Sequence, residues 1–261
     1  MLPTVRIVGC PVTALPFATQ IETMVNWALE RSSRVVCVAN VHMLMEARWQ
    51  LPLHSILHTA DIVTPDGMPL VWMIRLITGK PQDRVAGLDI LTGVCELAQA
   101  TGVSVYFLGS QAAVLERMRT RLKQEFPSLQ IAGMDPLPFR PLTSKEDEEL
   151  IQRVNASGAG VAFVALGCPK QEYWMAQHRQ KIQAVMIGLG GAFPVYAGIQ
   201  RRAPYWVRQV GLEWLYRLIQ EPKRLWSRYA TTIPPFVCLA VKQILTEPAE
   251  RSPINSQPQP K

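Results

Sequence analysis

The chain has 261 residues, of which 48% are hydrophobic and 18% are charged, a composition that supports a sizeable apolar core and excludes an intrinsically disordered protein. The formal net charge of +7 is unevenly placed, because residues 201–261 carry 10 Lys and Arg against 4 Asp and Glu, whereas residues 1–200 carry 17 against 16. No run of the sequence approaches the ~20 apolar residues of a membrane span, and the first residues lack the basic and apolar regions of an export signal.

The five cysteines are odd in number and scattered, without a CxxC pair. They suit buried or free thiols in a reducing cytosol better than a disulfide framework or a zinc site, so we expect a cytoplasmic protein. His54 and His58 are four residues apart but lack the glutamate of a zinc-binding HExxH motif, and the chain has no Asp-x-Asp pair to hold a divalent cation. The sequence predicts neither a metal nor a cofactor.

Several short apolar runs end in loops of small or polar residues, and segments with helical periodicity follow. The runs cover residues 35–39, 62–64, 103–108, 161–166 and 185–189. Apolar runs without alternation indicate strands that are buried on both faces of a mostly parallel sheet, so the predicted class is α/β with a Rossmann-like fold. Ligands of such sheets bind beyond the carboxyl ends of the strands, and the loops there are the first candidates for a site.

The chain divides into three parts by composition. Residues 1–200 are predicted to form the α/β body, and residues 201–246 a helical appendage that is rich in basic and aromatic side chains. Pro204 and Pro222 interrupt the appendage, and a short apolar stretch follows Pro234 and Pro235. Residues 247–261 are rich in Pro, Gln and Ser and are predicted to be disordered.

A Pro-Asp-Gly turn places Asp66 and Gly67 directly after the apolar run at residues 62–64. The carboxylate would then lie at the ligand edge of the sheet, where a general base is useful. Pro69 suits the first position of the next helix, which predicts Met68 rather than Asp66 as the helix cap. An ordinary turn is an interpretation of equal weight, because this tripeptide is a strong turn signal in any protein.

A glycine loop joins the run at residues 161–166 to the next helix. Its backbone N–H groups and the helix dipole favour an anion, and Lys170 and Gln171 add donors. An ordinary connection with Pro169 at the helix start is the alternative interpretation. The loop has the sequence Gly167, Cys168, Pro169, Lys170, Gln171 and Glu172.

A second glycine loop resembles the dinucleotide-binding fingerprint but departs from it. Gly188 and Gly190 are followed by Gly191, and Phe193 stands where the third glycine of the fingerprint belongs. No acidic residue follows about 20 positions later, so a nicotinamide-dependent enzyme is disfavoured. A close approach of this loop's backbone to a nucleotide diphosphate is still a possible interpretation of the glycines.

Residues 201–230 combine seven basic residues with six aromatic ones, a pattern that favours a phosphate, an anionic lipid surface or a nucleic acid as partner. A solvated charged face above buried tryptophans is the alternative. Arg217, Arg224 and Arg228 would share one face if the helix continued through Pro222. The basic residues are Arg201, Arg202, Arg208, Arg217, Lys223, Arg224 and Arg228, and the tryptophans are Trp206, Trp214 and Trp226.

These motifs occur together and in order in one family: from about residue 5 to residue 230 the chain resembles the bacterial WecG/TagA/CpsF glycosyltransferases, glycosyltransferase family twenty-six. The residues that carry the resemblance are Asn40, Val41 and His42, the run 61–67 with Pro65, Asp66 and Gly67, Arg84, Gly87 and Asp89, Leu108, Gly109 and Ser110, the two glycine loops, Arg202 and Pro204, and Gly211, Glu213, Trp214, Arg217, Glu221 and Arg224.

The resemblance implies transfer of an N-acetylmannosamine-type sugar from a UDP donor to N-acetylglucosamine on undecaprenyl diphosphate, for a cell-surface polysaccharide or a teichoic-acid-type polymer. It implies inversion at the anomeric carbon without a metal, with Asp66 as the base and Asn40 beside it. The other substrate-binding residues it implies are Gly67, Arg84, Gly87, Asp89, Gly109, Ser110, Gly167, Pro169, Lys170, Gln171, Glu172, Gly190, Gly191, Phe193, Arg202, Arg217 and Arg224.

The family also implies that the appendage completes the active site and contacts an anionic membrane, which makes the protein peripheral at the cytoplasmic face of the cell membrane. Val38 is a departure, because many relatives have a threonine there, so one hydroxyl contact is missing or supplied elsewhere. A different UDP-sugar donor is one alternative, and a basic nucleic-acid-binding protein is another from a different class. A homo-oligomer is compatible with the sequence.

Overall fold

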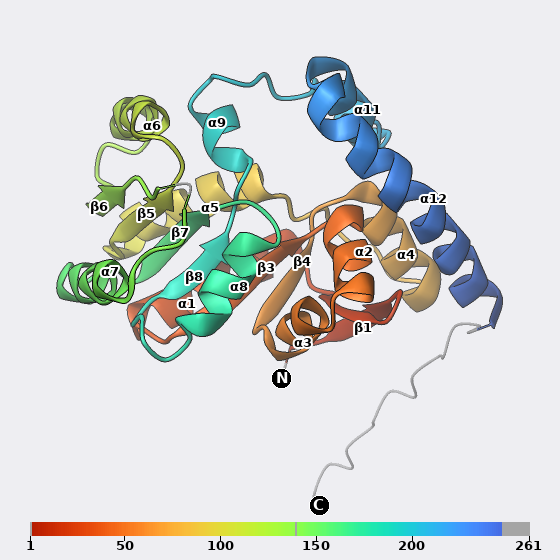
Figure 1. The fold of residues 1–261 in the computed structure, drawn as a ribbon, viewed down its shortest axis with the longest axis horizontal. Coiled ribbons are helices and arrows are strands. Elements are labelled where there is room, and N and C mark those ends of the chain that lie inside the picture. Colours follow the sequence, from red (N-terminus) through yellow and green to blue (C-terminus); the bar gives the residue numbers. More distant parts are fainter. Residues whose placement is uncertain (1, 139, 247–261) are drawn as a thin grey trace, which may run out of the picture.

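A computed structural model describes residues 2–138 and 140–246 (Figure 1). Its centre is a six-stranded parallel sheet with the strand order β4-β3-β8-β7-β5-β6. The α/β class with a Rossmann-like parallel sheet is therefore confirmed, and the five apolar runs of the sequence each contain a strand. The strands are β3 (Arg34–Ala39), β4 (Ile62–Pro65), β5 (Val105–Gly109), β6 (Ile131–Asp135), β7 (Val161–Ala165) and β8 (Val185–Gly188).

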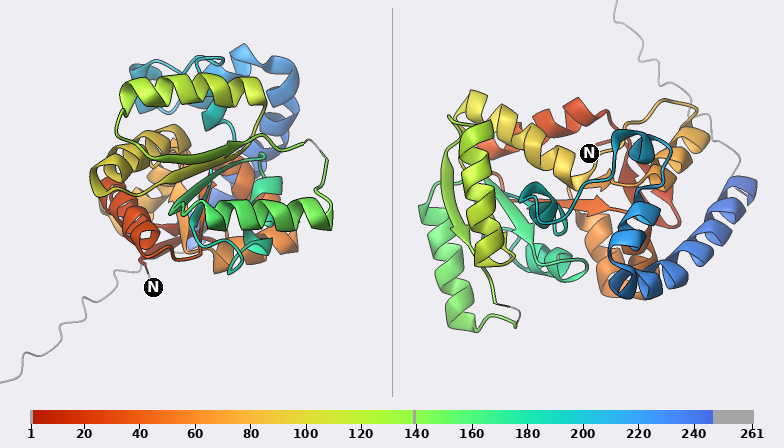
Figure 2. Two further views of the ribbon diagram at one scale, coloured as in Figure 1. Left: turned by 90° about the vertical axis from the view of Figure 1, so that its left-hand side faces the viewer. Right: turned by 90° about the horizontal axis from the view of Figure 1, so that it is seen from above.

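Helices cover both faces of the sheet, and the two further views in Figure 2 show these layers. One face carries α1 (Phe17–Leu29), α5 (Gly87–Thr101), α6 (Ala112–Glu125) and α9 (Ala192–Tyr196). The other face carries α2 (Val41–Trp49), α3 (Leu51–Thr59), α4 (Met68–Thr78), α7 (Ser144–Ala156) and α8 (Lys170–Gln177).

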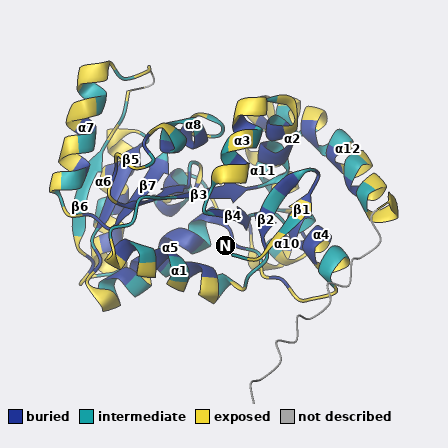
Figure 3. Ribbon diagram, turned by 90° about the horizontal axis from the view of Figure 1, so that it is seen from below, coloured by how far each residue is buried: buried dark blue, intermediate teal, exposed yellow. Residues whose placement is uncertain are grey.

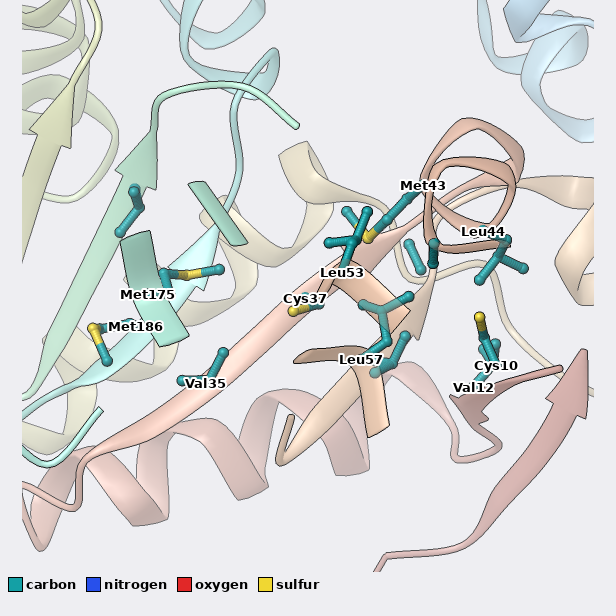
Figure 4. Close-up of a cluster of buried hydrophobic side chains, with 14 of the residues drawn as sticks. Cys10, Val12, Val35, Cys37, Met43, Leu44, Leu53, Leu57, Met175 and Met186 are labelled. Atoms are coloured by element: carbon teal, nitrogen blue, oxygen red, sulfur yellow. The ribbon is translucent and has the colours of Figure 1, made fainter. Parts of the chain in front are cut away.

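The strands are apolar throughout because consecutive side chains enter two different hydrophobic cores. In β3, Val35 and Cys37 belong to the core under α2 and α3, whereas Val36 and Val38 belong to the core under α1 and α5. Figure 4 shows side chains of the first of these cores, among them Val35 and Cys37 of β3 and Leu53 and Leu57 of α3. Burial on both faces explains why the runs show no alternation.

Two parts of the fold have no counterpart among the predicted elements. An antiparallel hairpin of β1 (Thr4–Ile7) and β2 (Cys10–Thr13) precedes the sheet, and the Thr13 hydroxyl accepts a hydrogen bond of 3.1 Å from the backbone of Val63. Edge strand β6 is half-buried along its length, so it lacks the apolar run that marks the other strands.

Three helices follow the body and confirm the helical character of residues 201–246. They are α10 (Tyr205–Gln209), α11 (Glu213–Gln220) and α12 (Pro222–Thr246). The condition that one helix continues through Pro222 is wrong, because α11 ends at Gln220 and Glu221 leaves helical geometry with φ −134° and ψ 59°. The predicted apolar stretch after Pro235 is the second half of α12, which includes Pro234 and Pro235 in its interior.

Helix α12 packs along α2 and α4 of the body (Figure 1). Its far end is tied to the N-terminal hairpin, since the Gln243 side chain accepts a hydrogen bond of 2.9 Å from the backbone of Val8 and donates one of 2.8 Å to the carbonyl of Arg6. Figure 3 shows that α12 and α7 keep strips of exposed residues, while β3, β4, β5 and β7 are largely buried. The predicted disordered segment 247–261 lies outside the described residues.

All five cysteines are free, as expected, and three of them are buried. Across residues 2–138 and 140–246, no helix combines the length and the apolar character that crossing a bilayer would require. His54 and His58 stack with their ring centroids 4.1 Å apart, and in the described chain no three His, Cys, Asp or Glu side chains cluster as metal ligands would.

Candidate active site

The carboxyl ends of four neighbouring strands bring the main predicted residues to one edge of the sheet. Asn40 follows β3, Asp66 follows β4, Gly167 lies just beyond β7, and Gly190 lies just beyond β8. The order β4-β3-β8-β7 makes these strands adjacent, although their loops are up to 150 residues apart in the chain. Parallel strands thus build the site that the sequence placed in their loops.

The turn that carries Asp66 is held from both sides. Its backbone N–H donates to the carbonyl of Ala39 at 2.8 Å, and the carbonyl of Pro65 accepts from Val85 at 3.0 Å. The cap of α4 is Gly67 rather than the predicted Met68, with Pro69 in the first turn, so the Asp66 carboxylate is not used as the helix cap.

Asp66 faces the cavities described below but is otherwise surrounded by protein. The loss of hydration raises the pKa of its carboxyl from 3.8 to about 7. This pKa already includes the nearby charges: the Glu213 carboxylate contributes to the rise, whereas Arg84 and Arg217 oppose it. A carboxyl group that titrates near neutral pH is suited to proton transfer, so Asp66 stays a candidate for the general base.

Asn40 has a structural task beside its predicted one. Its Oδ1 accepts a hydrogen bond of 3.1 Å from the backbone of Met43 and caps helix α2. The cap fixes the orientation of the amide and leaves Nδ2 as the group that can donate into the site.

The two glycine loops enclose the side chain of Gln171. Its Oε1 accepts from the backbone of Gly167 at 3.2 Å, and its Nε2 donates to Glu172 at 2.8 Å. A Cβ atom on Gly188 would lie 2.9 Å from Nε2, and one on Gly190 would lie 3.0 Å from Oε1. The glycines thus permit a close approach by Gln171, where the sequence suggested an approach by a nucleotide diphosphate.

A polar cavity of about 210 Å³ lies between these loops and the appendage. Its charged lining residues are Asp66, Arg201, Arg202, Glu213, Arg217, Glu221, Arg224 and Arg228. Every arginine in this set belongs to the appendage, and the body contributes one carboxyl group. Arg217, Arg224 and Arg228 therefore do meet, even though α11 and α12 are separate helices.

An apolar groove of about 440 Å³ adjoins the polar cavity. Helix α4 forms one wall with Trp72, Met73 and Leu76, and α12 forms the other. The polar cavity and the apolar groove share one wall, which consists of Asn40, His42, Asp66, Glu213, Arg217 and Arg228.

Ion pairs fasten the appendage to the body next to Asp66. Arg84 pairs with Glu213 of α11 and lies 3.5 Å from Asp89, and Asp89 also pairs with Arg202. Arg224 is paired with Glu221. Arg217 and Arg228 have no carboxylate partner within the described ranges, so their charges are available to an anion in the polar cavity.

The structure brings most of the predicted residues together. The polar cavity is lined by Asn40, Asp66, Gly87, Gly167, Gln171, Gly190, Gly191, Arg202, Arg217 and Arg224, and Gly67 and Arg84 line the apolar groove. Asp89 reaches the site only through its arginine partners. Val38 also lines the polar cavity, so this position offers methyl groups and no hydroxyl to a ligand.

The other predicted residues lie outside both cavities: Gly109, Ser110, Pro169, Lys170, Glu172 and Phe193. Phe193 packs in the core with its ring centroid 5.8 Å from that of Phe107. A Cβ atom on Gly109 would lie 2.6 Å from the carbonyl oxygen of Ala165, which explains that glycine by strand packing. Glu172 is buried beneath Gln171, and desolvation raises its pKa to about 7.

Three residues of the shared wall were absent from the predicted site. His42 and Glu213 belong to motifs that carry the family resemblance, and Arg228 belongs to the basic band. Burial and the nearby Arg228 lower the pKa of His42 to about 4, so its imidazole is neutral at physiological pH. These side chains come together because α12 packs against α2, a contact that the local sequence does not indicate.

Comparison with known proteins decides the family. Residues 5–250 match the model of the glycosyl transferase WecG/TagA/CpsF family. The chain belongs to this family. The WecG/TagA/CpsF match covers both the body and the appendage and identifies the protein as a glycosyltransferase rather than a nucleic-acid-binding protein.

Two relatives carry the same name, N-acetylglucosaminyldiphosphoundecaprenol N-acetyl-beta-D-mannosaminyltransferase. The protein from Bacillus spizizenii strain W23 is 34% identical over 228 residues, which cover 87% of this chain and 85% of the relative. The protein from Bacillus subtilis strain 168 is 31% identical over 217 residues, which cover 82% of this chain and 81% of the relative.

Proposed function

We propose that this WecG/TagA/CpsF glycosyltransferase moves an N-acetylmannosamine-type sugar from a UDP donor to N-acetylglucosamine on undecaprenyl diphosphate. The names of its two relatives support the sugar and the acceptor. The observation that carries the proposal is the position of Asp66, a carboxyl group with a pKa of about 7 at the junction of a cationic cavity and an apolar groove. The product would serve synthesis of a cell-surface polysaccharide or a teichoic-acid-type polymer.

In the proposed reaction Asp66 removes the proton from the attacking hydroxyl of the acceptor sugar. The hydroxyl oxygen forms a bond to the anomeric carbon as the bond from that carbon to the diphosphate oxygen breaks, and the electron pair leaves with UDP. Attack opposite to the leaving group inverts the anomeric centre. Because the pKa of Asp66 is near 7, its carboxylate is a stronger base than an exposed aspartate and is still ionised at slightly alkaline pH.

The departing diphosphate needs positive charge as it leaves. We assign this task to Arg217 and Arg228, with Arg224 and Arg202 beside them and with backbone N–H groups of the loops at residues 167–171 and 190–191. Arginines can bind two phosphate oxygens at once and carry their charge at every physiological pH. A metal ion is therefore not required by the proposal.

The appendage also has the character of a membrane-binding surface. Large apolar side chains are exposed on all three of its helices, among them Trp206 and Trp226, which are 66% and 67% exposed. Tryptophan favours the membrane–water interface, and each Lys or Arg near an anionic bilayer gains about 1 kcal/mol. We place the protein at the inner face of the cell membrane, attached peripherally, with residues 1–200 and 201–246 as catalytic body and membrane-facing appendage.

The donor is tested with a panel of UDP-sugars and a lipid-linked N-acetylglucosamine diphosphate acceptor, with and without EDTA. We expect UDP-N-acetylmannosamine to be used best and EDTA to have no effect. Asp66→Asn, which keeps the size of the side chain, should lower kcat by at least ~10³-fold and leave the dissociation constant of UDP within about twofold. A fully active variant, or a preference for another sugar, contradicts the corresponding part of the proposal.

Membrane attachment is tested by sedimentation with vesicles of neutral or anionic phospholipid. Binding should require the anionic vesicles and weaken steeply above ~0.3 M salt, because exposed charges are screened over a few ångströms there. Trp226→Ala should weaken binding several-fold, whereas Trp49→Ala, a change at a half-exposed tryptophan at the end of α2 in the body, should not. Equal effects of the two changes would show that the appendage is not the contact surface.

A further inference from the structure

The apolar groove is larger than the polar cavity, although the chemistry assigned above takes place in the polar cavity. One wall is a stripe of apolar side chains along the second half of α12, at the spacing of one helix face, with Ile233, Val237, Val241 and Ile244. The other wall is α4, with Trp72 and Leu76. Phe236 and Ala240 of α12 also line the groove, and both are buried.

The groove is lined by Asp66 where it meets the polar cavity, and it has an exposed apolar rim. The shared wall of Asn40, His42, Asp66, Glu213, Arg217 and Arg228 joins it to the polar cavity. Trp72 lies against Gly211 of the appendage, where a Cβ atom would come within 2.7 Å of the ring. At the rim, Leu76 is 61% exposed, Val237 is 52% exposed and Val241 is 51% exposed.

The change from a charged wall to apolar walls limits which ligand can bind in the groove. A ligand of the groove must present a polar, anionic part to the arginines of the shared wall and a long apolar part to α4 and α12. An exposed apolar strip of this length is costly in water unless a ligand or a membrane covers it. Residues 247–261 do not fit, because apart from prolines they contain only Ala249 and Ile254 as apolar residues. A single phospholipid acyl chain would match the walls but gives no reason for the opening at Asp66.

We propose that the apolar groove binds the first isoprene units of the acceptor's lipid carrier, with the diphosphate at Arg217 and Arg228 and the acceptor sugar at Asp66. The proposal rests on the proposed function, since it takes a polyprenyl diphosphate sugar as the acceptor. It adds a subsite for the lipid that lies within the protein, between α4 and α12, so the carrier is recognised by its chain as well as by its sugar.

The test compares two acceptors that differ only in chain length: N-acetylglucosamine diphosphate esterified with a five-carbon prenyl group or with a fifteen-carbon farnesyl group. Both are used without membranes, below the concentration at which the farnesyl compound forms micelles. For the unmodified protein we expect kcat/KM to be at least tenfold higher with the farnesyl acceptor, because only its chain extends along the groove.

Two substitutions fill the groove from opposite walls at exposed rim positions, Val241→Trp on α12 and Leu76→Trp on α4. Each should reduce the farnesyl advantage to less than threefold and leave kcat/KM for the five-carbon acceptor within twofold. Cys238→Trp is the matched control, because Cys238 is an exposed residue of α12 that does not line the groove, and it should keep the full advantage. Melting temperatures of all variants verify that they fold.

The outcomes separate this inference from the proposed function. If neither acceptor is glycosylated by the unmodified protein, the proposed function fails. If both are glycosylated and both groove variants keep the tenfold advantage, the groove is not the lipid subsite and the inference is wrong. An equal loss with Cys238→Trp would assign the chain-length effect to the surface of α12. Binding of a fluorescent farnesyl diphosphate that Val241→Trp weakens at least fivefold would support the subsite without any turnover.

Discussion

The body and the appendage contribute opposite charges to the same cavity. The body lines it with glycines, amides and one carboxyl group, Asp66, whereas the appendage lines it with five arginines and two glutamates. In the proposed reaction this division separates two tasks, since the body removes a proton and the appendage stabilises the leaving group. Neither region lines the cavity alone, and the residues that line it lie up to 190 positions apart in the chain.

The two regions are also held together differently. Strands β3, β4, β5, β7 and β8 of the body are buried on both faces, while α11 has no buried residue and α10 has only Val207. The appendage is fastened near the site by the ion pairs of Arg84 with Glu213 and of Asp89 with Arg202. Segments with few buried contacts open at a lower free-energy cost than the core, so α10 and α11 are the parts of the site that move most readily.

Among changes in the appendage and at its contacts with the body, the largest effect is expected when an arginine of the polar cavity is removed. Arg217→Ala should lower kcat by about 10²–10³-fold, because one preorganised donor to a developing anion is worth that much in other enzymes. Lys223→Ala is the matched control, since Lys223 is an exposed cation of the appendage outside the polar cavity, and it should stay within twofold. Steady-state kinetics at saturating donor measure both. Comparable losses would show that total charge matters rather than its position.

An intermediate effect is expected on the pH dependence, which tests whether the appendage tunes the base of the body. A base with a pKa near 7 is protonated below that pH, so kcat/KM should fall about tenfold per pH unit there and level off above pH 8. Glu213→Gln removes a carboxylate that raises the Asp66 pKa and frees Arg84, which lowers it. Both changes shift the acidic limb of the profile to lower pH.

Glu172 provides the control for that experiment, because burial raises its pKa to about 7 as well. Glu172→Gln should leave the midpoint of the limb unchanged if Asp66 is the titrating group. If the acidic limb moves with Glu172→Gln and stays in place with Glu213→Gln, the titrating group is Glu172 and not Asp66. That outcome would contradict the proposed mechanism.

The smallest effect is expected at Gly191, where the body touches the appendage. Its φ of −66° suits any residue, so Gly191→Ala should leave the melting temperature the same or slightly higher. The added methyl group would lie 3.3 Å from the Nη2 atom of Arg217 and displace that side chain by a few tenths of an ångström. We expect kcat to fall about twofold to tenfold. Unchanged kinetics would show that Arg217 is not held closely against this loop.

The sequence predicted those elements and site residues that have a recognisable local pattern. Apolar runs gave the strands of the doubly covered sheet, and small-residue loops after them gave Asn40, Asp66 and the glycine loops. The β1–β2 hairpin and β6 lack such runs, because β1 is largely exposed and β6 is only half-buried along its length. Two features depend on how α12 packs against α2 and α4: the proximity of Arg228 to His42, and the apolar groove. Packing between helices that are distant in the chain leaves no pattern in the local sequence.

The two hydrogen bonds between the Gln243 side chain and the N-terminal hairpin have a consequence for substrate binding. It anchors the far end of α12, and with it the groove wall, to a hairpin that is itself hydrogen-bonded to β4. The α12 wall of the apolar groove is thereby tied to the sheet at a point far from the ion pairs beside Asp66. An acceptor lying along this wall would therefore meet Asp66 in a fixed geometry.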